Sequence, residues 1–449
     1  MPLHVIIIGA GTGGMCLAQG LLRAGISVAV YERDRTRSDG LYGYRIGIDP
    51  TGNKALKESL PPELFDTFVA TCARAPRYLN VLTERLRSVA SFPLRPDDDE
   101  LDSERSVSRM TLRQVLLTGL EDVVRFDKTF THYETKADGT VTAYFEDGTS
   151  ATGDVLVAAD GTGSRVRRQY LPHAEVTDSG IISVAAKVPL VPETRKLLRP
   201  EVLNGISMLF APKGAFCILH VMEFKWDRDA TVKEGIGETD AGLIAKWPGL
   251  LYDNTRDYIN WGFSMPRERL PSDVLRMEGE ALKDLVLAKT PGWHPDLRRL
   301  FALADPSSCV PIELRSSKPV APWVTTTVTL LGDAIHTMTP GRGVGGNTAL
   351  RDAALLRRAL VSAHNGDRGL LDALADYETE MIRYGFERVA DSLKQNGTSA
   401  DDPMFKPYTG RAMLAVTRAF FRLTARVPAM RRKFIDDLYT YRGADDPAF

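Results

Sequence analysis

The chain has 449 residues, of which 43% are hydrophobic and 26% are charged, and its formal net charge at pH 7 is −1. This balance is typical of a globular protein with a sizeable core, and it excludes the strongly basic surface that recruits nucleic acid. The length suggests two or three domains, or one large interleaved domain. The four cysteines are scattered without a C-x-x-C pair, so the sequence indicates neither a metal site nor a disulfide framework.

The first residues leave no room for a signal peptide, because a strand-like apolar run already begins at Val5. No apolar run approaches the length needed to span a membrane. We therefore expect a cytoplasmic protein with no membrane span and no nucleic-acid partner.

The segment from Val5 to Glu32 carries the first motif. A run of β-branched residues leads into G-x-G-x-x-G at Gly9, Gly11 and Gly14, and a helical segment and a second strand follow before Glu32. In such a turn the first glycine permits the tight bend, the second admits a pyrophosphate, and the third lets the helix pack closely. A carboxylate at the end of the second strand can accept from a ribose hydroxyl. The segment predicts a dinucleotide-binding turn, and the alternative is a glycine-rich turn that binds nothing.

The middle of the chain changes character near Gly180. Helices and strands are mixed before this point, and strands then follow one another without helices. The strands expected are 181–188, 206–210, 216–224 and 258–265, after an earlier pair at 78–83 and 88–92. Consecutive strands of this kind predict an antiparallel sheet in a second domain. A strand is expected again at 324–331, a long helix at 347–363, and mostly helix from 369 to 441.

Two later strands end in acidic turns. The first ends in Asp160-Gly161, where a buried carboxylate could meet the polar edge of a cofactor, although a simple strand-terminating turn is the alternative. The second ends in Gly332-Asp333, and a glycine-rich loop then leads to Asn347 at a helix start. Asp333 could bond polyol hydroxyls, and the loop amides at the helix terminus could hold the electron-rich edge of a ring system.

These three motifs, in this order, resemble the FAD-dependent flavoprotein monooxygenases of the aromatic-hydroxylase type, the group that includes para-hydroxybenzoate hydroxylase. The third motif continues through His336, Met338, Pro340, Gly343, Gly345 and Asn347 to Asp352 and Ala353. Arg109, within SRMTLRQVL, also matches an arginine that reaches the flavin in this family.

The resemblance implies an α/β fold in which a Rossmann-like FAD-binding domain is interleaved with an antiparallel-sheet substrate domain, followed by a helical C-terminal region. The expected boundaries are 1–75, 101–178 and 305–365 for the FAD-binding domain, 76–100 and 179–304 for the substrate domain, and 366–449 for the helical region.

By the same resemblance, FAD would be the cofactor and NADH or NADPH its transient reductant. One oxygen atom from O2 would be inserted into a small-molecule substrate that is bulky and apolar and has aromatic or polyketide-like character. The residues expected to bind the cofactor are Gly9, Gly11, Thr12, Gly13, Gly14, Glu32, Arg33, Arg45, Arg109, Asp160, Asp333, Gly343, Gly345, Gly346 and Asn347.

No residue of the sequence can be assigned as a catalytic base, and none as a metal ligand. The side chains considered for the substrate surface are Phe210, His220, Met222, Trp261 and Phe263. Burial in the core of the sheet is the alternative for each of them, and for His220 the alternative is a core histidine with satisfied hydrogen bonds.

Three further interpretations stay open from the sequence alone. An FAD-dependent reductase or oxidase that never hydroxylates would keep every cofactor motif, and a non-catalytic flavin-binding module would keep the fold. Arginines at 418, 422 and 426 give the C-terminal region a basic amphipathic helix. This helix is a solvated face, or it caps one side of the molecule or mediates self-association as a homodimer.

Overall fold

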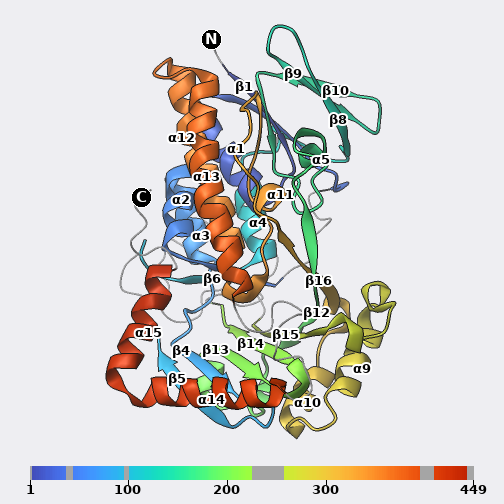
Figure 1. Cartoon of the computed structure of the whole chain (residues 1–449), viewed down its shortest axis with the longest axis vertical. Coiled ribbons are helices and arrows are strands. Elements are labelled where there is room, and N and C mark those ends of the chain that lie inside the picture. The colour runs from blue at the N-terminus through green and yellow to red at the C-terminus, as the bar shows by residue number, and fades with distance from the viewer. Residues whose placement is uncertain (1–2, 37–43, 96–100, 225–256, 395–408, 442–449) are drawn as a thin grey trace.

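The computed structural model describes residues 3–36, 44–95, 101–224, 257–394 and 409–441 (Figure 1). It has the expected mixed α/β architecture. A parallel sheet with its helices lies at one end of the long axis, and a larger sheet lies at the other (Figure 1). None of the helices in these parts of the chain is long and apolar enough to cross a membrane.

The parallel sheet has five strands in the order β17-β11-β1-β2-β7. Their bounds are β1 His4–Ile8, β2 Ser27–Tyr31, β7 Val124–Arg125, β11 Val155–Ala158 and β17 Val328–Leu330. The central strands are buried on both faces, which is why they consist of almost uninterrupted Val, Ile and Leu. Because all five strands run in one direction, the turns that follow β1, β2, β11 and β17 meet at a single edge of the sheet.

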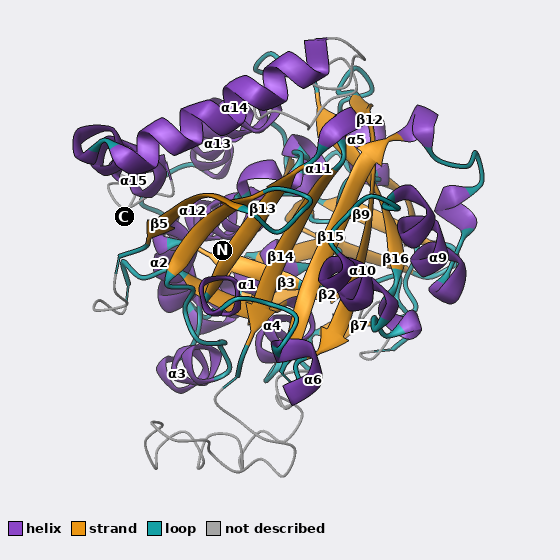
Figure 2. Cartoon of the chain, turned by 90° about the horizontal axis from the view of Figure 1, so that it is seen from below, coloured by secondary structure: helices purple, strands orange, loops and turns teal. Residues whose placement is uncertain are grey.

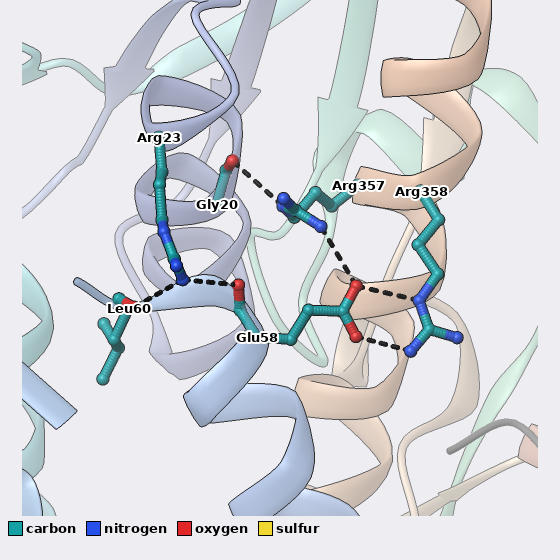
Figure 3. A network of polar contacts seen from close by, with 6 residues as sticks. All are labelled: Gly20, Arg23, Glu58, Leu60, Arg357 and Arg358. Carbon is teal, nitrogen blue, oxygen red and sulfur yellow. Dashed lines mark hydrogen bonds and ion pairs between the residues drawn. The ribbon is translucent and has the colours of Figure 1, made fainter. Parts of the chain in front are cut away.

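Helices α1 (Thr12–Arg23), α2 (Pro50–Ser59) and α12 (Gly345–Asn365) pack against one another beside this sheet. A polar network joins them (Figure 3). Glu58 of α2 accepts from Arg357 at 3.0 Å and from Arg358 at 2.8 Å, and Arg357 also donates to the Gly20 carbonyl of α1 at 3.1 Å. The network joins α1, α2 and α12 through their C-terminal halves.

The larger sheet has seven strands in the order β16-β12-β15-β14-β13-β4-β5. Their bounds are β4 Tyr78–Leu82, β5 Ser88–Pro93, β12 Val176–Pro189, β13 Gly205–Phe210, β14 Phe216–Met222, β15 Tyr258–Pro266 and β16 Val310–Ser317. All neighbours are antiparallel except β13 and β4. The register pairs Leu219 with Trp261 and His220 with Asn260, so successive residues face opposite sides.

The two faces of this sheet are covered by different helices. Trp261 and Phe263 pack with Trp293 and Phe301 beneath α9 (Gly279–Lys289) and α10 (Pro295–Ala302). On the other face, Phe210 and the β4–β5 strands pack against α14 (Thr409–Arg426) and α15 (Pro428–Tyr441), which run along the outside of the molecule (Figure 2). The C-terminal helices therefore cover only one margin of that second face.

The remaining elements are two small sheets and several helices. The sheets pair β3 (Arg45–Ile48) with β6 (Arg105–Ser108), and β8 (Phe130–Thr135) with β9 (Val141–Phe145) and β10 (Ser150–Gly153). The helices are α3 Pro62–Ala70, α4 Arg109–Leu117, α5 Arg165–Tyr170, α6 Pro192–Arg195, α7 Pro200–Leu203, α11 Asp333–His336 and α13 Leu370–Leu393. The β3–β6 pair was not expected from the sequence, and the strand expected at 324–331 is shorter than predicted because β11 pairs with only three of its residues.

Candidate functional site

The glycine-rich turn after β1 is pressed against the end of β11. Gly9 has a φ of +107°, and a Cβ atom there would lie 2.4 Å from the Ala159 carbonyl oxygen. A Cβ at Gly14 would lie 2.4 Å from the Gly9 carbonyl oxygen. At Gly11 the nearest atom would be 3.9 Å away, so this glycine faces open space at the start of α1. The turn is closed on the protein side and open where a pyrophosphate would approach.

Glu32 connects this turn to the loop that follows β2. Its Oε2 accepts from the Ala10 amide at 2.6 Å, and its Oε1 accepts from the Asp34 amide at 3.0 Å. Arg113 of α4 pairs with the Asp34 carboxylate at 2.8 Å, whereas Arg33 is exposed. A carboxylate has acceptor capacity beyond two bonds, so Glu32 can still accept from a hydroxyl.

Asp160, at the end of β11, has one satisfied and one unsatisfied oxygen. Its Oδ2 accepts from the Arg165 amide at 2.8 Å, and its Oδ1 is buried without a partner among the described residues. Burial raises the pKa of the carboxyl group, which hydrogen bonds from Ser164 and the Arg165 amide partly offset. A buried acceptor of this kind calls for a donor from a ligand or a water molecule.

Asp333, at the start of α11, follows a glycine in a conformation that only glycine adopts freely. Gly332 has φ 61° and ψ −142°. Although the Asp333 side chain reaches solvent, the surrounding protein desolvates its carboxylate and raises its pKa, against the opposing charges of His336 and Arg109. The structure therefore brings Asp333 and Arg109, two of the expected cofactor residues, close to each other.

A buried polar network lies directly behind Asp333. The Asp352 carboxylate of α12 accepts from the Gly332 amide at 2.6 Å, contacts His336 Nε2 at 2.6 Å, and accepts from the Tyr384 hydroxyl of α13. Burial alone would lower the pKa of His336, but the adjacent Asp352 charge and hydrogen bond raise it. The network holds the Gly332 backbone, and with it the position of Asp333.

Asn347, in the first turn of α12, uses its side chain inside the protein. Its Nδ2 donates to the Gly47 carbonyl at 2.8 Å, and its Oδ1 accepts from the Asp49 amide at 3.1 Å. A Cβ at Gly52 would lie 2.2 Å from that Oδ1, so α2 has glycine where it meets Asn347. Because the side chain is engaged, a ligand would meet the backbone amides of the α12 N-terminus, where Gly345 and Gly346 are half-buried.

The remaining glycines of the expected site have simpler surroundings. Gly343 is exposed with a φ of +68°, and its amide donates to the Pro340 carbonyl at 2.9 Å. Gly13 is buried, and a Cβ there would lie 2.7 Å from a Leu331 methyl group at the end of β17. The neighbouring Thr12 is half-buried at the first position of α1.

Residues 44 and 45 connect the cofactor loops to the seven-stranded sheet. The Tyr44 hydroxyl lies 2.7 Å from both the Ala185 and the Ser308 carbonyl oxygens. Arg45 donates from Nε to the Ser106 hydroxyl at 2.9 Å, and its charge helps to lower the pKa of His220. A hydrogen bond from Asn347 of α12 to Gly47 therefore joins α12 to β3, and the charge of Arg45 on β3 acts on His220 of β14.

The side chains considered for the substrate surface do not share one face. Phe210 stacks on Phe421 of α14, and Met222 is buried in a small cluster with Phe224 and Tyr258. Trp261 and Phe263 point to the opposite face, into the core beneath α9 and α10. Of this set, only His220 combines the face turned toward β3 with unsatisfied polar atoms.

The sequence analysis did not identify Tyr44 or Asn260, and it did not identify Asp352 as the acceptor of the buried network. Asn260 lies opposite His220 only through the register of β14 and β15, and the long connection between these strands hides that pairing from the sequence. Asp352 follows Asn347 within the recognised motif, so its position was visible although its role was not. In the described parts of the chain, no cluster of three or more His, Cys, Asp or Glu residues could hold a metal ion.

The observed features fit an elongated dinucleotide cofactor. Gly11 provides open space, and Asp160 provides a buried acceptor that has no partner in the described parts of the chain. Asp333 provides an accessible carboxylate beside Arg109, and α1 and α12 provide two helix N-termini. All of them lie at the carboxyl edge of the parallel sheet, where ligands of such folds bind.

Comparisons with known proteins agree with this geometry. A family model described as an FAD binding domain matches residues 2–43 and 302–389. The crystal structure of a candidate FAD-containing monooxygenase from Photorhabdus luminescens is similar with a TM-score of 0.75 and 34% identity, covering 88% of this chain and 98% of that one.

Two curated relatives are also similar along most of the chain. A dual O-methyltransferase/FAD-dependent monooxygenase of Cercospora beticola is 33% identical over 407 residues, and an FAD-dependent urate hydroxylase of Klebsiella pneumoniae is 27% identical over 391 residues. Each alignment covers 84% of this chain, and they cover 44% and 85% of the respective relative. The chain thus spans less than half the length of the dual-function relative.

Proposed function

Because the chain belongs to the FAD-dependent monooxygenases of the aromatic-hydroxylase type, we propose that it inserts one oxygen atom of O2 into a small organic substrate, with NADH or NADPH as the transient reductant. One observation carries the proposal. The turns that follow β1, β11 and β17, which contain Gly9, Asp160 and Asp333, converge at one edge of the parallel sheet. A chance glycine-rich turn would not be accompanied by two acidic turns on the neighbouring strands.

The residues of the chain would hold FAD in separate roles. The open side of Gly11 would admit the pyrophosphate, Glu32 would accept from the adenosine ribose, and Asp333 would accept from the ribityl chain. When bound, FAD supplies the redox chemistry, taking hydride from the nicotinamide and activating O2. The protein's task is to position the substrate beside the flavin and to exclude water.

The face of the larger sheet that is turned toward β3 is the proposed substrate surface. Small residues Ala185 and Gly262 form its centre, and the half-buried Met208, Phe216 and Ile218 border it. This composition supports a bulky, largely apolar substrate of aromatic or polyketide-like character. We also propose the domain division given above, with the substrate between the two sheets.

Isotope labelling tests the function directly. FAD-loaded protein, NADPH or NADH, oxygen-18 gas and a panel of polycyclic hydroxyaromatic compounds are incubated together, and the products are analysed by mass spectrometry. We expect one labelled oxygen atom in a product of the accepted compound. Nicotinamide oxidation that yields only labelled hydrogen peroxide would contradict oxygen insertion and favour the oxidase alternative.

A further inference from the structure

Two opposed side chains on the proposed substrate surface have polar atoms that lack partners among the described residues. His220 on β14 and Asn260 on β15 are direct cross-strand neighbours, so both side chains project from the same face. His220 is 2% exposed, and both of its ring nitrogens lack a hydrogen bond within the described parts of the chain. The Oδ1 atom of Asn260 is likewise buried and unpaired there.

Elsewhere the same sheet satisfies its buried amides. Asn80 of β4 is 1% exposed, and it bonds the Glu201 carbonyl at 2.8 Å, the Ser207 hydroxyl at 3.2 Å and the Ser91 hydroxyl at 2.8 Å. A buried polar group left without a partner costs about 1–3 kcal/mol. Trp261 Nε1, Ser316 Oγ and Ser317 Oγ of the same sheet also lack a partner in the described parts of the chain. His220 and Asn260, however, bring three such atoms together on one face, and a group of this kind calls for a ligand.

The surroundings keep the imidazole neutral. Burial, with the Arg45 charge as a second cause, lowers the pKa of His220 well below 6.5. A neutral imidazole presents one donor and one acceptor, and the Asn260 carbonyl presents a further acceptor. The three unpaired atoms therefore offer one donor and two acceptors to whatever occupies the site.

Donor and acceptor matching selects among ligand groups. An apolar ring edge would leave all three atoms unpaired. A carboxylate has no proton to give, so both protein acceptors would remain unsatisfied. A hydroxyl group donates once and accepts once, and it can satisfy the imidazole donor together with one of the acceptors. The nearby Arg45 charge also favours a hydroxyl that is acidic, as a phenolic hydroxyl is.

We propose that His220 and Asn260 bind an aromatic hydroxyl group of the substrate and so determine which ring the enzyme accepts, an inference that rests on the proposed function. The pair lies on the sheet face that is turned toward β3, and β3 in turn is bound by Asn347 of α12. A hydroxyl held by the pair would therefore fix the position of the substrate ring relative to the flavin. His220 and Asn260 are specificity-determining residues in this proposal and take no part in bond making.

Binding of two matched probes tests the proposal. Isothermal titration of the FAD-loaded protein compares 2-naphthol with 2-methoxynaphthalene, which has the same ring system without the hydroxyl proton. We expect the wild-type protein to prefer 2-naphthol by about tenfold or more, as sites built to bond a hydroxyl do. His220→Leu and Asn260→Leu should each lose most of this preference, whereas Asn80→Leu should keep it.

Thermal unfolding of the ligand-free protein is the second measurement. His220→Leu removes two ring nitrogens, and Asn260→Leu removes an amide oxygen, that are buried without a partner in the described parts of the chain, so both variants should melt at or above the wild-type temperature. Asn80→Leu breaks satisfied bonds and should melt lower. An unchanged probe preference in both variants, or a loss of stability in His220→Leu equal to that of Asn80→Leu, would overturn the proposal.

Neither measurement requires turnover, so the two proposals can fail separately. A probe preference without oxygen-18 incorporation would contradict the monooxygenase function and leave the binding pair intact. Oxygen insertion with no preference between the probes would contradict the binding pair alone. If His220→Leu does not fold, Asn260→Leu carries the same comparison with Asn80→Leu.

Discussion

Two buried histidines show how differently the two sheets of this molecule use a polar side chain. His336 lies behind the cofactor turns, where the Asp352 carboxylate at 2.6 Å raises its pKa despite burial. His220 lies on the larger sheet, neither of its nitrogens has a hydrogen bond within the described parts of the chain, and its pKa is lowered. His336 is paired through Nε2 and holds a loop in place, whereas His220 is unpaired among the described residues and turned toward the proposed substrate.

The two histidines illustrate two roles of buried polar groups: positioning the backbone of the protein and recognising a ligand. A polar group whose bonds are all made within the protein fixes a geometry, as Asp352 fixes Gly332. A polar group whose bonds are left open costs stability in the empty protein and recovers that cost only when a ligand binds. Substitutions in the two regions should therefore have opposite signs in stability assays.

The largest effect is expected at the paired site. Asp352→Ala removes the common acceptor of the Gly332 amide, His336 and the Tyr384 hydroxyl, all of which are buried. Breaking a buried pair on one side costs about 3–5 kcal/mol, so urea unfolding should show a loss of that size. The control is Asp391→Ala, which removes an exposed i,i+3 pair with Lys394 and should change stability by at most about 0.5 kcal/mol. Equal effects of the two substitutions would show that the network stabilises nothing.

The next effect concerns the cofactor. Asp333→Ala removes a carboxylate proposed to accept from FAD, and hydrogen bonds to charged groups contribute about 1.5–3 kcal/mol. Calorimetric titration of apoprotein should show FAD binding weakened roughly 10- to 100-fold. Asp333→Asn keeps one acceptor and should lie between Ala and the wild type. An unchanged affinity in Asp333→Ala would remove this residue from the site.

The parts of the molecule that local chemistry determines were predictable from the sequence. Gly9 and Gly14 admit no Cβ because backbone oxygens lie 2.4 Å from that position, and such constraints are visible as a motif of fixed spacing. The strand, turn and helix around them follow from short-range periodicity. The acidic turns at Asp160 and Asp333 were recognised in the same way, because each directly follows its own strand.

The parts determined by long-range pairing were not predictable. β3 has four residues and pairs with β6, which is far away in the sequence, so no periodicity marks it, yet it carries Arg45. Alternation correctly grouped His220 with Phe216 and Met222 on one strand. It could not show that Trp261 lies on the opposite face, because that depends on the register between β14 and β15.

The pH dependence of stability sharpens the comparison between the two histidines. The pKa of His336 is raised in the folded protein. Its contribution to the free energy of unfolding is therefore fully present below the unfolded-state pKa near 6.5, and it is lost as pH rises through the folded-state pKa. The His220 pKa is lowered, so its neutral form contributes stability above 6.5 that is lost as pH falls. For each histidine, the free energy of unfolding changes by at most about 1.4 kcal/mol per pH unit.

Paired variants would isolate these two slopes. Urea unfolding of the wild type, His336→Gln and His220→Gln between about pH 5 and 8 gives the difference in free energy of unfolding at each pH. Relative to His336→Gln, the wild type should lose stability as pH rises; relative to His220→Gln, it should lose stability as pH falls. Slopes of the same sign would contradict the contrast between a paired and an unpaired histidine.

The smallest effect on stability is expected on the outer face of α14, where the homodimer that the sequence left open can be tested. Val416, Phe420 and Leu423 are 62%, 51% and 52% exposed and lie on one side of the helix, while Phe421 packs inward against Phe92 and Phe210. Phe420→Ser should therefore change the free energy of unfolding by no more than about 0.5 kcal/mol. If the stripe joins two copies, sedimentation should show a dimer for the wild type and a monomer for Phe420→Ser. Phe421→Ser should instead destabilise the fold, because it removes an inward aromatic contact. A monomeric wild type, or a dimer that Phe420→Ser leaves intact, would contradict self-association through this face. The exposed Arg422 and Arg426 would then belong to a solvated surface, whereas Arg418 is partly buried and pairs with Glu84 at 2.6 Å.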